Sequence, residues 1–312
     1  MVKTNSFRFP SSDGIHQCYA AEWLPEGQPR AVVQLVHGIS EYAERYDRFA
    51  RFLAERGFLV CGEDHLGHGR TAEADGVFGW FAEEKGWEKV LSDVHTLRTL
   101  QGENYPGLPY FLFGHSMGSF LTRSYLIRYP GTVSGALLSG TGQEPLPMVR
   151  FGRTVAQALV KAGRGKQVSP LITALSLGSY NRAFAPNRTS VDWISRDEAV
   201  QDAYLADPFC KFLPTAGMFR DMMDGLLLIG DPKNLTAMDK STPVFFLSGD
   251  HDPVGQMGKG VVKVYDMFKA AGCADVTLKL YRDGRHEMLN ELNYEQVHQD
   301  VLEWLENKLE KV

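Results

Sequence analysis

Short apolar runs alternate with helical patterns in the first 141 positions of this 312-residue chain. Residues 31–36 and 110–113 are nearly continuous apolar runs of the length expected for buried strands. Between them, apolar residues recur every three or four positions in residues 46–54 and 90–100, which predicts two amphipathic helices. This alternation is typical of an α/β protein with a mostly parallel, doubly wound sheet. A turn cluster at Ser11–Gly14 predicts a β-hairpin at the start of the chain, before the alternating pattern begins.

The alternation stops after Gly142 and resumes near residue 236. Residues 142–235 contain helix-like segments and no convincing strand. Residues 244–247 and 276–281 again have the pattern of strands, and residues 261–271 and 294–309 that of helices. We therefore expect a core formed by residues 1–141 and 236–312, with a helical lid of residues 142–235 inserted over the edge of the sheet.

The pentapeptide Gly114-His115-Ser116-Met117-Gly118 follows one predicted strand and leads into a predicted helix at residues 119–129. In that context a Gly-x-Ser-x-Gly pattern is typical of a nucleophile elbow, a sharp turn that exposes the serine at the end of a strand. The two glycines remove Cβ atoms that would clash in such a turn. The pattern alone also arises by chance, so the flanking strand and helix carry the prediction that Ser116 is a nucleophile.

A serine hydroxyl needs a base, and the base needs an acid that orients it. In sheets with such an elbow the acid and then the base come later in the chain. Asp250 and Asp252 both follow the strand at residues 244–247. We prefer Asp252, because it lies deeper in the loop, directly before Pro253; the alternative is that either aspartate only caps the turn.

Three histidines follow the lid and are candidates for the base. His251 adjoins the acid too closely to be oriented by it, and His298 lies within a predicted helix. His286 lies in the loop after the strand at residues 276–281, so we predict it as the base, with an ordinary surface histidine as the alternative. The oxyanion of such a reaction is expected to be bound by the backbone N–H groups of Ile39 and Met117.

Composition narrows the remaining possibilities. Hydrophobic residues make up 44% and charged residues 23%, as in ordinary globular proteins, and the net charge of −5 argues against nucleic acid as the main partner. The first six residues contain no apolar signal-like run, so we expect a cytoplasmic protein whose four scattered cysteines are free thiols. His65 and His68 have metal-pair spacing without an apparent third ligand, so we expect a structural turn, no metal and no cofactor.

Several motifs lie on the two sides of the lid: His37–Glu41, Arg45-Tyr46, Asp64–Gly69, Tyr105–Pro109, the elbow itself and Gly249–Val254. As a set they resemble the monoacylglycerol lipase and lysophospholipase group of α/β-hydrolases, also described as serine aminopeptidase S33-like. The resemblance implies the α/β-hydrolase fold. It also implies roles for five residues: Ser116 as nucleophile, Asp252 as acid, His286 as base, and Ile39 and Met117 as oxyanion donors.

In monoacylglycerol lipases the positions that match Glu41 and Arg45 lie near the polar head of the substrate. With His115 they are therefore our candidates for binding a glycerol or phosphate head group. The alternative for Glu41 and Arg45 is an internal ion pair that holds the oxyanion loop. A second histidine that follows the base in mammalian members is replaced here by Leu289, a departure that bears on glycerol recognition.

These features together lead to the hypothesis of a serine carboxylic-ester hydrolase for monoacyl lipid esters, such as monoacylglycerol or lysophospholipid. Met222, Met223 and Leu226 of the lid are candidate contacts for the acyl chain, or else ordinary lid core. The hypothesis leaves open a transient contact of the lid with a membrane or micelle surface. The alternatives are a hydrolase of small aryl or short-chain esters or of peptides, and a non-catalytic binding protein. Because Ser116 takes the place of an elbow aspartate, epoxide hydrolases and dehalogenases are disfavoured.

Overall fold

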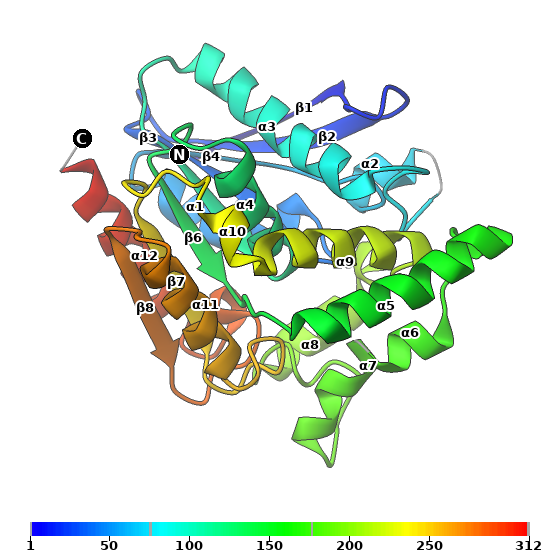
Figure 1. Ribbon diagram of the computed structural model, residues 1–312. Helices are drawn as coiled ribbons and strands as arrows, with labels where there is room; N and C mark the ends of the chain where they lie inside the picture. The colour runs from blue at the N-terminus through cyan, green and yellow to red at the C-terminus, as the bar shows by residue number, and fades with distance from the viewer. Residues whose placement is uncertain (1, 75–76, 176, 311–312) are drawn as a thin grey trace.

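An eight-stranded, mostly parallel sheet forms the centre of the structure (Figure 1). The computed structural model describes residues 2–74, 77–175 and 177–310. The strands are β1 (Lys3–Pro10), β2 (Gln17–Leu24), β3 (Ala31–Val36), β4 (Phe58–Glu63), β5 (Tyr110–His115), β6 (Gly135–Ser139), β7 (Val244–Gly249) and β8 (Val276–Tyr281). Their order is β1-β2-β4-β3-β5-β6-β7-β8, with β2 antiparallel to both of its neighbours and the other pairs parallel.

Helices connect the parallel strands and cover both faces of the sheet. They are α1 (Asp47–Ala54), α2 (Gly69–Glu73), α3 (Gly86–Asn104), α4 (Met117–Arg128), α5 (Leu146–Leu159), α6 (Pro170–Leu175), α7 (Leu177–Tyr180), α8 (Glu198–Ala206), α9 (Ala216–Gly230), α10 (Pro232–Leu235), α11 (Lys259–Ala270) and α12 (Tyr294–Leu309). Single turns of 3₁₀ helix occupy Ala43–Tyr46, Asn181–Phe184, Pro208–Cys210 and Met288–Asn290, and a π-helical turn occupies Val160–Arg164.

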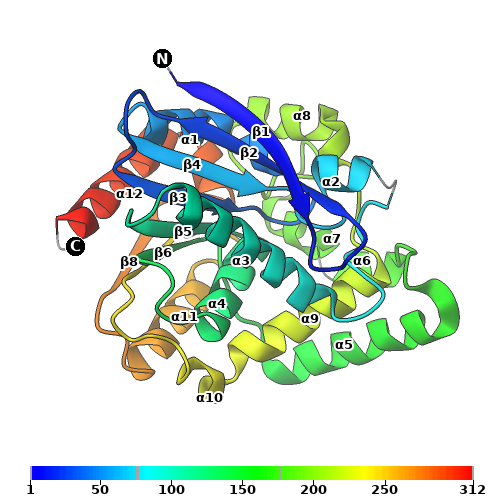
Figure 2. The same cartoon turned by 90° about the horizontal axis from the view of Figure 1, so that it is seen from above.

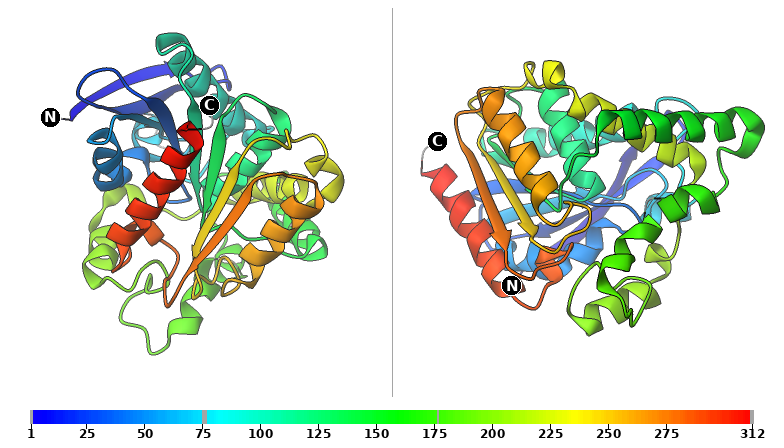
Figure 3. Two further views of the ribbon diagram at one scale, coloured as in Figure 1. Left: turned by 90° about the vertical axis from the view of Figure 1, so that its left-hand side faces the viewer. Right: turned by 60° about the horizontal axis from the view of Figure 1, so that its bottom comes forward.

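The sheet separates two apolar clusters, because successive side chains of a strand point to opposite faces. On β3, Val32 faces the cluster under α3, α4 and α11, whereas Val33 faces the cluster under α1 and α12. Leu112 and Phe111 divide in the same way on β5. Figure 3 shows α1 and α12 together on one side of the sheet and α11 on the other.

The apolar patterns in the sequence predicted these elements closely. The expected bounds of β3, β8 and α12 match the structure, and the expected hairpin is β1 paired with β2. The other expected strands and helices are confirmed with ends that differ by a few residues, for example α3, which begins at Gly86 rather than Val90. The fold is the α/β-hydrolase fold that the resemblance implied. All four cysteines are buried free thiols, as expected.

The segment between β6 and β7, residues 140–243, is called here the inserted segment, and it carries α5 to α10. Its described residues contain no strand, only an isolated bridge between Val168 and Thr215. Helices α5 and α9 lie side by side (Figure 2), and α9 also packs against α4. The part of the inserted segment that carries α5 to α8 lies beyond the carboxyl ends of the parallel strands (Figure 3), and the chain then returns to the amino end of β7. Among the described helices, none combines the length and the hydropathy needed to cross a membrane.

Candidate active site

Ser116 occupies the turn between β5 and α4, at the carboxyl edge of the sheet. Its backbone has φ 54° and ψ −121°, a conformation that residues other than glycine rarely adopt. Its N–H donates to the carbonyl of Ser139 in β6 at 2.9 Å. A Cβ on Gly118 would lie 1.8 Å from the carbonyl oxygen of Val36, so only glycine lets α4 approach β3 this closely. The predicted strand, sharp turn and helix around Ser116 are therefore present.

Asp252 and His286 come from the loops after β7 and β8 and meet in the interior. Nδ1 of His286 lies 2.9 Å from Oδ2 of Asp252, and both residues are buried. The same carboxylate accepts from the Ser248 hydroxyl at 3.2 Å, and its Oδ1 accepts from the Val254 N–H at 2.9 Å. Three donors thus hold one buried carboxylate in a single orientation, facing the imidazole.

Asp250 has different surroundings from Asp252. It lies at the surface, where its carboxylate pairs with the exposed His251 at 2.6 Å. Asp283 joins these two residues in a group whose ligand atoms lie within 4.8 Å of one another, close enough for a metal ion. Exposed groups of this kind are common without an ion, and we assign it no role. Of the two candidate acids, the structure brings Asp252 to His286 and leaves Asp250 outside.

The imidazole of His286 lies against the backbone that supports the elbow. A Cβ on Gly140 would lie 2.9 Å from its Cε1, and Gly140 directly follows Ser139, the partner of the Ser116 N–H. The rings of His286 and His115 are 4.6 Å apart between centroids. Among the described residues no hydrogen bond joins His286 to the Ser116 hydroxyl; such bonds are often long without substrate and shorten in the complex.

Electrostatics distinguish the two neighbouring histidines. Burial acts to lower the pKa of His286, but the charge and hydrogen bond of Asp252 outweigh burial, and the pKa is raised above the ordinary value of 6.5. Burial and the neighbouring His286 lower the pKa of His115 to about 3. One imidazole is therefore prepared to accept a proton near neutral pH, while the ring beside it stays neutral.

Two backbone N–H groups flank Ser116. A Cβ on Gly38 would lie 3.0 Å from the Cβ of Ser116, which brings the loop after β3 against the elbow. Neither the N–H of Ile39 in that loop nor that of Met117 is engaged by another described residue. Met117 is the first residue of α4, where the helix dipole favours negative charge.

The loop after β3 also carries Glu41, which is buried, and Arg45, whose side chain is mostly buried. Arg45 pairs with Glu41 at 3.1 Å and with Glu287, the residue after His286, at 2.7 Å. With His115 these residues line a small hollow whose wall also includes Tyr46, Leu289 and Asn290. The internal ion pair that the sequence analysis weighed as an alternative is thus formed. Glu287 is not predicted from the sequence, because no local pattern singles out an acid that follows a loop histidine.

The predicted acyl-chain residues lie on α9 of the inserted segment. Met223 and Leu226 are buried in the larger apolar cluster, and Met222 packs against it. Helix α9 packs against α4, the helix that begins directly after Ser116. Their packing fits both alternatives from the sequence, an acyl-chain contact or ordinary core.

The inserted segment also supplies a residue that the sequence analysis did not assign to the site. The Trp193 ring lies 5.0 Å from that of His286, and its carbonyl accepts from the His286 N–H at 3.3 Å. Trp193 in turn packs against Tyr180 at 5.1 Å. The loop that carries His286 is thereby held by the inserted segment.

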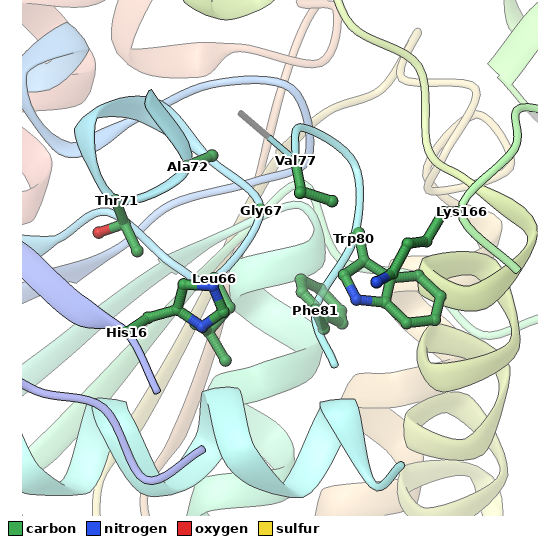
Figure 4. A pocket seen from close by; sticks show the side chains of 9 residues that line it. All are labelled: His16, Leu66, Gly67, Thr71, Ala72, Val77, Trp80, Phe81 and Lys166. Carbon is green, nitrogen blue, oxygen red and sulfur yellow. The ribbon is translucent and has the colours of Figure 1, made fainter. Parts of the chain in front are cut away.

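A second hollow, shown in Figure 4, is lined by a different set of residues. Leu66, Phe81 and Trp80 line it, and Lys166 lies with its Nζ 5.3 Å from the Trp80 ring centroid. None of the predicted site residues contributes to its wall. His65 and His68, the pair with metal-like spacing, are buried near it and pack around His37.

Comparisons with known proteins find lipases and an esterase that are similar in sequence or fold. The chain is 31% identical over 291 residues to the monoacylglycerol lipase of Mycolicibacterium smegmatis, covering 92% of each chain. It is 30% identical to the monoglyceride lipase of Homo sapiens, covering 86% of this chain and 80% of that protein. The crystal structure of a highly thermostable carboxyl esterase from Bacillus coagulans in complex with glycerol superposes with a TM-score of 0.92 at 31% identity, covering 99% of this chain and 100% of that one. The family described as serine aminopeptidase, S33 matches residues 27–293, and the chain belongs to this family.

Proposed function

We propose that this protein is a serine carboxylic-ester hydrolase that cleaves monoacyl lipid esters, with monoacylglycerol as the preferred class. The observation that carries the proposal is the buried pair of Asp252 and His286 at 2.9 Å, beside the elbow that presents Ser116. The relatives named as monoacylglycerol lipases and the carboxyl esterase that binds glycerol support the same chemistry and substrate class. The protein is a carboxylic-ester hydrolase on these grounds.

In the proposed reaction Oγ of Ser116 attacks the ester carbonyl carbon while His286 takes the proton of the Ser116 hydroxyl. The carbonyl π electrons move to the oxygen, and the tetrahedral intermediate collapses when His286 returns the proton to the leaving alcohol. A water molecule then attacks the acyl-enzyme with the same base, which releases the fatty acid and restores the serine. Asp252 keeps the proton of the neutral imidazole on Nδ1 and stabilises the imidazolium.

The negative charge on the carbonyl oxygen needs donors that are already oriented. The backbone N–H groups of Ile39 and Met117 are proposed for this role, because they flank Ser116 and no described residue uses them. Since both act through the backbone, conservative changes of the Ile39 or Met117 side chain are expected to leave the oxyanion site intact.

The charges near the site favour a neutral head group over a phosphate. Arg45 is already paired with two carboxylates, those of Glu41 and Glu287. Arg45, the arginine that lines this hollow, therefore has little charge left for a phosphate, whereas a neutral glycerol head group needs none and its hydroxyls can accept from His115 or Asn290. Monoacylglycerol therefore fits this surface better than lysophospholipid.

The inserted segment is proposed to act as a lid and to contact the surface of a membrane or micelle. On α5, Met148 and Phe151 are exposed at 62% and 68%, on the same helix as Arg150. Leu171 on α6 is exposed at 59%, and Arg164 and Lys166 lie in the connection between the two helices. Exposed apolar side chains with basic residues around them are the composition of a helix that lies on an anionic lipid surface. Met222, Met223 and Leu226 on α9 are proposed to face the acyl chain.

An ester panel tests the function. We expect hydrolysis of 1-monooctanoylglycerol and p-nitrophenyl octanoate well above that of p-nitrophenyl acetate, and none of leucine p-nitroanilide. A steep preference for acetate would refute the lipid proposal, and cleavage of the anilide would favour a peptidase. A fluorophosphonate probe is expected to label wild-type protein and not Ser116→Ala, whose kcat falls by about 10⁴- to 10⁶-fold. Absence of labelling in the wild type would instead indicate a non-catalytic protein.

A further inference from the structure

A buried ion cluster connects the two loops that flank the elbow. Arg45 donates to Glu41 at 3.1 Å and makes two hydrogen bonds of 2.7 Å each to the carboxylate of Glu287. The three side chains are 13%, 4% and 6% exposed, in that order. Glu41 also accepts from the Tyr46 hydroxyl at 2.8 Å. We call Glu41, Arg45, Tyr46 and Glu287 the Arg45 cluster.

On one side, the Arg45 cluster holds the loop after β3. Glu41 accepts a hydrogen bond from the N–H of Gly38, and Nδ1 of His37 lies 2.7 Å from the carbonyl oxygen of Gly38. Nε2 of His37 accepts from the His65 N–H, so Nδ1 carries the proton and donates. In a trans peptide the C=O and the next N–H point in opposite directions. The His37 bond to the Gly38 carbonyl therefore fixes the direction of the Ile39 N–H, the proposed oxyanion donor, while the Glu41 bond from the Arg45 cluster holds the peptide just before Gly38.

On its other side, the Arg45 cluster holds the loop after β8. Glu287 directly follows His286, and its N–H donates to the Ile194 carbonyl at 2.7 Å. With its backbone bonded to the inserted segment and its carboxylate bonded to Arg45, Glu287 has little freedom to move. The position of His286 is thereby tied to that of Arg45, which is 242 residues away from Glu287 in the sequence.

The inserted segment also contacts the Arg45 cluster. The guanidinium carbon of Arg45 lies 4.9 Å from the centroid of the Tyr204 ring, within the range of a cation–π interaction. The Tyr204 hydroxyl donates to the carbonyl of Ser40 at 3.1 Å, in the same loop as Gly38. Arg45 is thus in contact with the loop after β3, the loop after β8 and the inserted segment.

The charges of the cluster fit an internal role. Burial acts to raise the pKa of Glu287, but the charge and hydrogen bonds of Arg45 outweigh it and lower the pKa, so this carboxylate stays ionised. Burial raises the pKa of Glu41 against the opposing charge of Arg45. A buried guanidinium whose charge is already balanced has little left for a substrate, whereas removing it leaves two uncompensated carboxylates.

We propose that Arg45, through Glu41 and Glu287, is a positioning residue that sets the oxyanion donor Ile39 and the base His286 in one fixed geometry, instead of binding the head group of the substrate. This inference rests on the proposed ester hydrolysis. It also accounts for the pairing of Arg45 with Glu287, which a head-group role does not explain. Its distinguishing consequence is that loss of Arg45 affects every ester alike, whatever its alcohol.

The test compares two esters with the same acyl chain, 1-monooctanoylglycerol and p-nitrophenyl octanoate, in Arg45→Gln and Glu287→Gln. We expect kcat to fall by up to about 100-fold on both esters, because small displacements of catalytic groups have effects of this size. KM is expected to stay within a few-fold of the wild type. Arg51→Gln is the matched control, because Arg51 makes an exposed ion pair with Asp47 on the same helix, and it is expected to leave both constants unchanged.

A head-group role predicts the opposite pattern, namely a raised KM for the glycerol ester with the p-nitrophenyl ester unaffected, and this result would overturn the proposal. The pH profile provides a second readout, because the charge of Glu287 contributes to raising the pKa of His286. In Glu287→Gln the acidic limb of kcat/KM should therefore move to lower pH, and an unmoved limb would contradict the coupling. Glu287→Gln keeps the test decisive where Arg45→Gln fails to fold. Failure of the proposed function itself is recognised separately, as a wild-type protein that hydrolyses neither ester.

Discussion

Replacing Asp252 by asparagine tests the proposed triad through a single atom. The carboxylate accepts through Oδ1 from the Val254 N–H and through Oδ2 from His286 and Ser248. An asparagine at this position has one oxygen and one NH₂, so it must choose which of these groups faces the imidazole.

The structure indicates which choice wins. With its NH₂ toward Val254, the amide would bury two donors against each other, at a cost of about 1–3 kcal/mol for each unsatisfied donor. The other orientation keeps the bond to Val254 and points the NH₂ at Nδ1 of His286. Nδ1 must then accept, so the neutral ring carries its proton on Nε2 and cannot take one from Ser116. A preference of about 2–6 kcal/mol corresponds to between about 30-fold and 10⁴-fold, since 1.4 kcal/mol is a factor of ten.

The lost carboxylate charge also destabilises the imidazolium, so we expect kcat for Asp252→Asn to fall by about 10³- to 10⁴-fold with the fold retained. Initial rates on p-nitrophenyl octanoate, normalised to the fraction of protein that a fluorophosphonate labels after long exposure, measure this effect. Asp250→Asn is the matched control; its exposed pair with His251 predicts a change of less than about twofold. If Asp252→Asn keeps a tenth of the wild-type kcat, or Asp250→Asn is the more damaging change, the assignment of the acid is refuted.

Three further substitutions test other parts of the reasoning. Gly140→Ala would place a Cβ 2.9 Å from Cε1 of His286 and should lower kcat by up to about 100-fold. Gly131→Ala is the control, because Gly131 has a similar positive φ and an added Cβ there would meet nothing closer than 3.7 Å. Equal effects of the two changes would contradict the steric argument. His298 is buried beside Phe49, and burial lowers its pKa from 6.5 to about 4. Unfolding therefore takes up a proton below pH 6.5, and the wild type loses about 2 kcal/mol of stability through His298 between pH 8 and pH 5. In denaturant titrations His298→Phe should lose less stability than the wild type over this range, by that amount. Equal losses in the variant and the wild type would argue against a neutral buried histidine. Phe151→Ser should weaken sedimentation with phosphatidylglycerol vesicles about tenfold, whereas unchanged binding would remove α5 from the proposed lipid contact.

The apolar pattern of the sequence was enough to predict most of the elements, because each depends on a local period. Residues 31–36 form a buried strand because all of them except Gln34 are apolar, which suits a sheet covered on both faces. The elbow was predicted for a similar reason: the strand, the glycines and the helix that Ser116 needs are all contiguous with it. The order of acid and base along the chain then restricted the search to a few residues.

The tertiary structure decided what depends on distant parts of the chain. Asp250 and Asp252 are two residues apart, and only the course of the loop after β7 turns one outward to His251 and the other inward to His286. The pairing of Arg45 with Glu287 has no local signature, because ion pairs carry no period and the partners come from opposite ends of the sequence. By itself the sequence determined which short segments form strands, helices and the serine turn, since neighbouring residues specify them. The surroundings of each charged side chain were decided by packing, because burial and partner distance exist only once the chain has folded.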